Sequence, residues 1–105
     1  MAIVPSGFIR QTEIEQAVQR AQNALLPDVV RIRYSIGSDW SGEPSIFFRV
    51  LLSDAASRPN NLQELAERVT LRLIDEVKSD EFGFHAYFNF RSESEQAKLN
   101  EPAWA

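Results

Sequence analysis

The chain of 105 residues contains no cysteine, and this absence excludes several classes of function at once. Disulfides, thiolate nucleophiles, thiolate zinc sites and iron–sulfur clusters all need cysteine sulfur. Long apolar runs are missing too, because no segment approaches the ~18 residues of a membrane span. The first seven residues lack the basic leader and the apolar run of a signal peptide. We therefore expect a cytoplasmic protein with no membrane partner.

Positive charge is also in short supply. There are 15 acidic against 11 basic residues, which gives a net charge of −4. Proteins that bind nucleic acid or anionic membranes without specificity rely on an excess of positive charge, so the overall balance disfavours both classes. A local basic patch remains compatible with it. Nine of the basic residues are arginine, which suits flat, bidentate or stacked contacts better than lysine does.

Recognisable catalytic motifs are absent as well. The four glycines are isolated from one another, so there is no phosphate-binding loop, and Ser41-Gly42 falls in a hairpin loop rather than at the strand-to-helix turn of a nucleophile elbow. His85 is the only histidine, and general-base or metal chemistry would need orienting groups that no spacing defines. A hard-cation site near His85 would draw on Asp39, Glu43, Asp80 and Glu81. We expect no catalytic residue, no metal site, no cofactor and hence no enzyme.

What the chain does have is a strong hairpin pattern. Two runs of strand-forming residues, 29–36 and 45–53, flank a turn over residues 37–44. Alternation predicts that each strand has one core face and one opposite face. The core faces comprise Val30, Ile32, Tyr34 and Ile36, then Ile46, Phe48, Val50 and Leu52. The opposite faces comprise Arg31, Arg33 and Ser35, then Phe47, Arg49 and Leu51.

Two helices are predicted around this hairpin. Thr12 and Glu15 fit a capping box that opens a helix ending at Pro27. Asn61 and Glu64 fit the cap of a second helix. Its buried stripe is predicted to contain Leu62, Leu65, Ala66, Val69, Leu73 and Val77, widened by Leu71 and Ile74.

A third strand, 82–91, and a short helix over 92–99 with a tail complete the pattern. With 44 % hydrophobic residues, the length fits one domain. We predict an α+β two-layer sandwich in the order α-β-β-α-β, with a three-stranded sheet, two helices on one face and a short C-terminal helix or arm. Residues 1–11 form an arm or a short edge strand around Ile3-Val4, residues 12–91 the domain, and residues 92–105 the C-terminal helix and tail.

The helix-free face of this sheet is the main candidate site. It gathers Arg31, Arg33, Phe47, Arg49, His85, Tyr87 and Arg91. Aromatic rings beside guanidinium groups suit single-stranded RNA or DNA, but no RNP-type motif or GXXG loop accompanies them. The other interpretation is a face buried against a second copy, a partner protein or the chain's own tail. We favour burial, because the chain is acidic overall and mixed apolar faces commonly mark interfaces.

Two tryptophans extend this surface. Trp40 lies in the hairpin loop, where it either anchors an interface or folds back over the open edge of the sheet. Trp104, in the tail, either docks on the domain or is presented to a partner. The sequence thus favours a non-catalytic interaction protein that forms a homo-oligomer or binds a protein partner. The alternative is binding of RNA or single-stranded DNA through the arginine–aromatic face.

Overall fold

Strand β2, Pro44–Leu52, is the central strand of the sheet. The computed structural model describes residues 11–105, and in it β1, Val29–Ser38, pairs antiparallel with one side of β2. On the other side, β3, His85–Ser92, pairs parallel with β2. The antiparallel pair is the predicted hairpin. The parallel pair requires the chain to cross over the sheet, and a helix makes that crossing.

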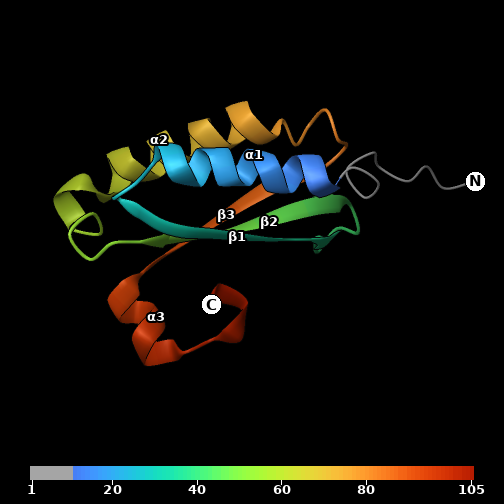
Figure 1. The fold of residues 1–105 in the computed structure, drawn as a ribbon. Coiled ribbons are helices and arrows are strands. Elements are labelled where there is room, and N and C mark those ends of the chain that lie inside the picture. Colours follow the sequence, from blue (N-terminus) through green and yellow to red (C-terminus); the bar gives the residue numbers. More distant parts are fainter. Residues whose placement is uncertain (1–10) are drawn as a thin grey trace, which may run out of the picture.

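The crossing helix is α2, Pro59–Val77, and it lies beside α1, Gln11–Ala24, on the same face of the sheet (Figure 1). A short helix, α3, Glu93–Leu99, follows β3 directly, and a single 3-10 turn, Pro102–Trp104, ends the described chain. These last two elements lie across the opposite face (Figure 1). The predicted fold class and order of elements are therefore confirmed. The arm predicted at residues 1–11 lies outside the described residues, apart from Gln11, which opens α1.

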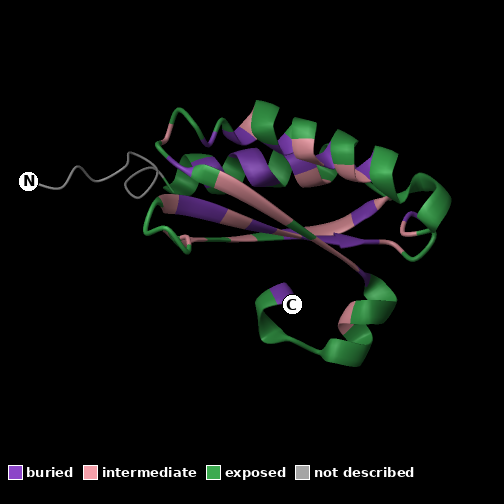
Figure 2. Ribbon diagram, turned by 180° about the vertical axis from the view of Figure 1, so that it is seen from behind, coloured by how far each residue is buried: buried purple, intermediate pink, exposed green. Residues whose placement is uncertain are grey.

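The hydrophobic core lies between the two helices and the sheet. Its buried members come mostly from α1, α2, β1 and β2, and β2 supplies more of them than β1 does, whereas β3 adds only partly buried side chains (Figure 2). They include Ile14 and Ala21 of α1, Val29 of β1, Ile46, Phe48, Val50 and Leu52 of β2, and Val69 and Leu73 of α2. None of the described helices is long and apolar enough to cross a membrane.

The start of β1 departs from the predicted alternation. Val29 pairs with Leu52 but Arg31 pairs with Leu51, so Val30 is an extra residue in a β-bulge. The bulge reverses the alternation at this point. Val29 is consequently fully buried in the core, and Val30, which was predicted there, is only half-buried.

The predicted helix starts were wrong in position. Thr12 already lies within α1, so it is not the cap. Helix α2 begins two residues before Asn61, with Arg58 as its N-cap and Pro59 at its first turn, where a missing N–H costs nothing.

The apolar stripe of α2 is narrower than predicted. Leu65, Val69, Leu73 and Val77 are buried as expected. Leu62, Leu71 and Ile74 are 38 %, 66 % and 45 % exposed, because α1 and the sheet cover only one side of the helix. The third strand is also shorter than predicted, since residues 82–84 belong to a turn closed by the Phe84 N–H donating to the Ser79 carbonyl at 2.9 Å.

The bulge generates a testable pair of substitutions. Val29→Ala removes two buried methyl groups and should lower the free energy of unfolding by about 2 kcal/mol. Val30→Ala removes the same groups from a half-buried site and should cost less than half as much. Urea unfolding followed by circular dichroism measures both. Equal losses, or a larger loss for Val30→Ala, would show that the alternation runs without a bulge.

Candidate interaction surface

The register of the three strands brings the predicted surface residues together in rows across the helix-free face. One row contains Arg31, Leu51 and Arg91, and the next contains Arg33, Arg49 and Asn89. The third contains Ser35, Phe47 and Tyr87, and His85 stands exposed in a fourth row beside Gly37 and Ser45. We call this set of rows the arginine face. All the sheet residues that the sequence predicted for it do share one side of the sheet.

The chain's own tail covers part of the arginine face, and this is one of the three coverings that the sequence left open. The Arg31 Nη2 donates to the Trp104 carbonyl oxygen at 2.8 Å, and the Arg33 Nε donates to the main-chain oxygen of Ala105 at 2.8 Å. The Arg49 Nε donates to the Ala103 carbonyl oxygen, again at 2.8 Å. Three arginines thus hold three consecutive main-chain oxygens. These bonds compensate the guanidinium groups for partial loss of water, and burial still lowers the pKa of Arg49.

Trp104 is the side chain that anchors this tail. Its ring is only 7 % exposed, and the Arg91 guanidinium carbon lies 4.3 Å from the ring centroid, a cation–π arrangement. Leu51, on the same face as Arg91, is 5 % exposed although it lies outside the main core. Trp104 is therefore docked on the domain, which is the first of the two alternatives that the sequence allowed. The second alternative, in which the Trp104 ring is exposed to a partner, is not observed.

Polar contacts fix the segment that carries Trp104 across the sheet. Helix α3 begins with a full capping box, in which Ser92 accepts from the Glu95 N–H and the Glu95 carboxylate accepts from the Ser92 N–H. The Ser94 hydroxyl donates to the Asp54 carboxylate at 2.6 Å. Arg91 donates to Gln96 at 3.0 Å and to the Glu101 carboxylate at 3.2 Å. The sequence predicted this helix but gave no indication of where it would lie.

Part of the arginine face stays open. The Phe47 and Tyr87 rings stack in parallel with centroids 5.4 Å apart, and both side chains are half-exposed. Between them and the tail lies a wide, shallow hollow of about 570 Å³, lined in part by Phe47, Arg49, Leu99 and Trp104. The tail therefore covers the arginine end of the face and leaves the aromatic end accessible.

Trp40 stands at the tip of the hairpin and is 92 % exposed. Its side chain does not fold back over the sheet edge, so of the two predicted arrangements only the outward one is present. It is by far the most exposed large apolar side chain of residues 11–105. Burying such a ring against another molecule would be favourable, whereas leaving it in water gains nothing for the isolated fold.

The loop that presents Trp40 is held by Asp39. One carboxylate oxygen accepts from the Ser41 N–H at 2.9 Å, from the Ser41 hydroxyl at 2.6 Å and from the Glu43 N–H at 3.0 Å. The other oxygen accepts from the Tyr87 hydroxyl at 2.7 Å. Gly42 completes the turn with φ of +86°, where a side chain would be strained. The loop is thereby built around a single side chain and tied to the arginine face.

These contacts shift two titrations in opposite directions. Hydrogen bonds from Ser41 and Tyr87 hold the pKa of the Asp39 carboxyl well below its usual range. The same bond to Asp39 raises the pKa of the Tyr87 phenol. Because the Asp39 pKa falls on folding, its carboxylate stabilises the fold at pH values above about 4, and that stabilisation is lost only as the pH falls below this.

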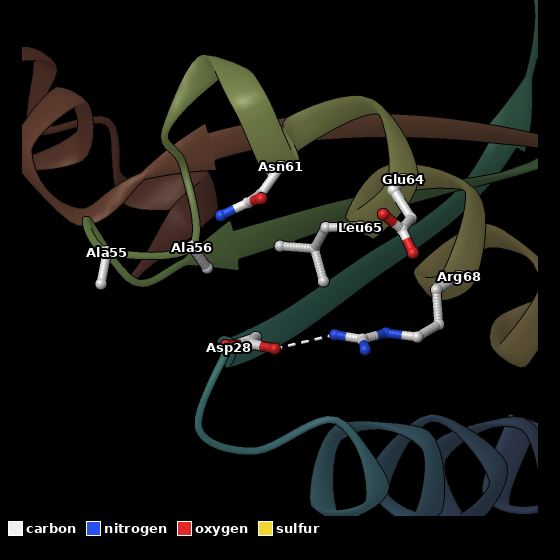
Figure 3. A pocket seen from close by; sticks show the side chains of 7 residues that line it. All are labelled: Asp28, Ala55, Ala56, Asn61, Glu64, Leu65 and Arg68. Carbon is white, nitrogen blue, oxygen red and sulfur yellow. Dashed lines mark hydrogen bonds and ion pairs between the residues drawn. The ribbon is translucent and has the colours of Figure 1, made fainter.

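The structure also shows a small hollow that the sequence did not suggest, beside the start of α2. It has a volume of about 280 Å³ and is walled by Leu65 and Ala56, with polar groups at its rim (Figure 3). The charged groups Arg68 and Asp28 pair with each other at 2.7 Å across its opening (Figure 3). Residues 11–105 hold no group of three or more histidine, aspartate or glutamate side chains that could share a metal ion.

Sequence reasoning missed the hydrogen bonds by which Asp39 holds the hairpin loop, and it missed the contact of Ser94 with Asp54. A signal for these bonds was present, since an aspartate two residues before Ser41 in a turn is typical of an arrangement in which the carboxylate binds main-chain N–H groups. No comparable signal marks Asp54, because its partner lies 40 residues away in the sequence. Contacts of that range depend on the tertiary fold.

The Asp39 contact predicts a change in tyrosine titration. Asp39→Asn removes the negative charge that disfavours the Tyr87 phenolate, so the pKa of Tyr87 should fall towards about 10. The chain has only two tyrosines, and the second, Tyr34, serves as an internal control because its pKa is raised mainly by burial. Nuclear magnetic resonance of labelled tyrosine rings resolves the two titrations. An unchanged Tyr87 titration would rule out the bond to Asp39.

Docking of the tail is tested by Trp104→Ala. Loss of the buried ring should release the segment after α3, speed amide hydrogen exchange in residues 93–105 and lower the free energy of unfolding by about 2–3 kcal/mol. Leu99→Ala is the matched control, since Leu99 lies in the same segment but is 54 % exposed. Exchange that rises equally in both variants, or in neither, would contradict a role for Trp104 as the anchor.

Comparisons with protein-family models, with curated proteins and with solved structures gave no match to this chain, so its function has to be inferred from the geometry of these surfaces.

Proposed function

We propose that the protein is a small, non-catalytic, cytoplasmic protein-interaction domain, which acts as an accessory or regulatory subunit by associating with a second copy or with a partner protein. The observation that carries this proposal is the exposure of Trp40, a tryptophan on a loop that hydrogen bonds from the main chain to Asp39 already order. Tryptophan is among the residues that most often dominate the energy of a protein interface.

The fixed loop matters as much as the ring. Binding costs free energy whenever a flexible segment must be ordered, and this cost falls when the segment is held in place beforehand. Asp39 orders the main chain on both sides of Trp40 by accepting from the Ser41 and Glu43 N–H groups. A partner would therefore gain the burial of the ring at little cost in loop entropy.

The open end of the arginine face offers a second contact area. Phe47 and Tyr87 lie half-exposed beside the loop, because Tyr87 itself binds Asp39. In this proposal Trp40, Phe47 and Tyr87 meet the partner. The tail is held in place by four arginines that contact Trp104 and its neighbours, namely Arg31, Arg33, Arg49 and Arg91.

Binding of RNA or single-stranded DNA is the second candidate. It is favoured by the stacked pair of Phe47 and Tyr87, since bases stack on such rings. Binding of a nucleic acid would also need the arginines of this face to bind its phosphate groups. Three of these arginines already donate to main-chain oxygens of the tail. A nucleic acid would therefore have to displace the tail first, which makes this candidate the less favoured one.

The experiment compares tagged wild-type protein with Trp40→Ala, both purified from the native host at low salt without nuclease. We expect a stoichiometric protein to co-elute with the wild type, and its amount to fall at least about tenfold with Trp40→Ala, since interface tryptophans commonly contribute 2 kcal/mol or more. Leu71→Ala is the matched control, because Leu71 is also a large exposed apolar residue but lies on α2.

Two outcomes would contradict the proposal. Equal co-elution with all three proteins would remove Trp40 from the interface. Co-eluting material with a nucleic-acid spectrum that disappears in high salt would support the second candidate instead, because release of counterions drives that binding.

A further inference from the structure

The two edges of the sheet are built differently. Strand β3 is an edge strand that pairs only with β2 within residues 11–105. It runs eight residues, His85–Ser92, in unbroken register, with no bulge, proline, glycine or lysine. Proteins usually protect an edge of this length with such features, because its unpaired N–H and C=O groups can pair with another chain. The edge of β3 shows none of them.

The opposite edge, that of β1, is protected twice. The bulge at Val30 interrupts its pairing pattern. Further along, the Gln22 side chain of α1 reaches down and its oxygen accepts from the outward-facing Ile32 N–H at 2.9 Å. A strand added to β1 would have to displace this amide. Among residues 11–105, these two devices protect only the edge of β1, so the open edge of β3 is not a general property of this sheet.

Side chains on β3 also lack cover. The core-facing residues of β2 are at most 1 % exposed, whereas Phe88 and Phe90 of β3, which point to the same side of the sheet, remain half-exposed. Phe88 already stacks on Phe48 at 5.2 Å, so only its outer side is open. A further strand beside β3 would cover these rings as well as satisfying the main-chain groups.

We propose that β3 pairs antiparallel with β3 of a second copy, which joins two three-stranded sheets into one sheet of six strands. Antiparallel pairing of a strand with itself is isologous and closes at two copies. It places the helices of both copies on one side of the joint sheet and both tails on the other. Charge does not oppose it, because the one permanently charged side chain of β3, Arg91, is already paired with Glu101.

This inference rests on the proposed interaction role but uses a different surface. The dimer edge does not include Trp40, so each proposal can fail while the other stands. The 105-residue chain at rising concentration should approach twice its mass of 12.0 kDa in sedimentation equilibrium. The outward amides of β3 should become protected from hydrogen exchange over the same concentration range.

The decisive variant replaces two exposed residues of the edge with lysine, His85→Lys and Asn89→Lys together. Like charges on facing strands should weaken the dimer by at least about tenfold while the monomer stays folded by circular dichroism. Ser38→Lys is the matched control, since it adds a charge at an exposed site on β1. It should leave the dimer unchanged, as should Trp40→Ala.

Several results would overturn the proposal. One is a mass of 12.0 kDa at every concentration with rapidly exchanging β3 amides. Another is a monomer whose β3 amides are protected independently of concentration, which would assign the edge to a segment of the same chain. A dimer that resists the double lysine variant, or that Ser38→Lys weakens equally, would place the contact elsewhere. If the lysine variant does not fold, the concentration dependence of β3 exchange in the wild type decides.

Discussion

Strand β2 has large apolar side chains on both faces, and this one constraint requires the other layers of the molecule. Its inward side chains, such as Phe48 and Val50, need the two helices. Its outward side chains, Phe47 and Leu51, would remain in water in a two-layer fold. The tail supplies a partial third layer, because Trp104 and α3 cross the end of the face where Leu51 lies. The molecule is therefore a two-layer sandwich with a local cover.

The manner in which this cover is held explains why an acidic protein keeps four arginines on one face. Arg33 and Arg49 stand opposite each other, an arrangement that repels unless acceptors lie between them. The acceptors are main-chain oxygens of Ala105 and Ala103 rather than acidic side chains. Each guanidinium group gains a hydrogen bond when it loses water, which limits the desolvation penalty.

Much of the fold could be predicted from the sequence where a pattern repeats locally. Alternation in the hairpin and the spacing of Leu65, Val69 and Leu73 gave the order of elements and their faces. The errors arose where the pattern is ambiguous or the cause is distant. The sequence around Val30 does not reveal the extra residue of the bulge, because apolar residues stand at both Val29 and Val30. The exposure of Leu71 depends on how far α1 extends over α2. The open face could be identified, but its covering by Trp104 depends on contacts across about 70 residues of chain.

Holding the tail through its main chain has a consequence for how the sequence can vary. The bonds from Arg33 and Arg49 reach oxygen atoms that every amino acid possesses. The side chains at Ala103 and Ala105 are exposed and take no part in them. Substitutions at these two positions can therefore leave the hydrogen bonds to the segment intact, whereas Trp104 is held by contacts of its ring. Among residues 103–105, selection is therefore concentrated at Trp104.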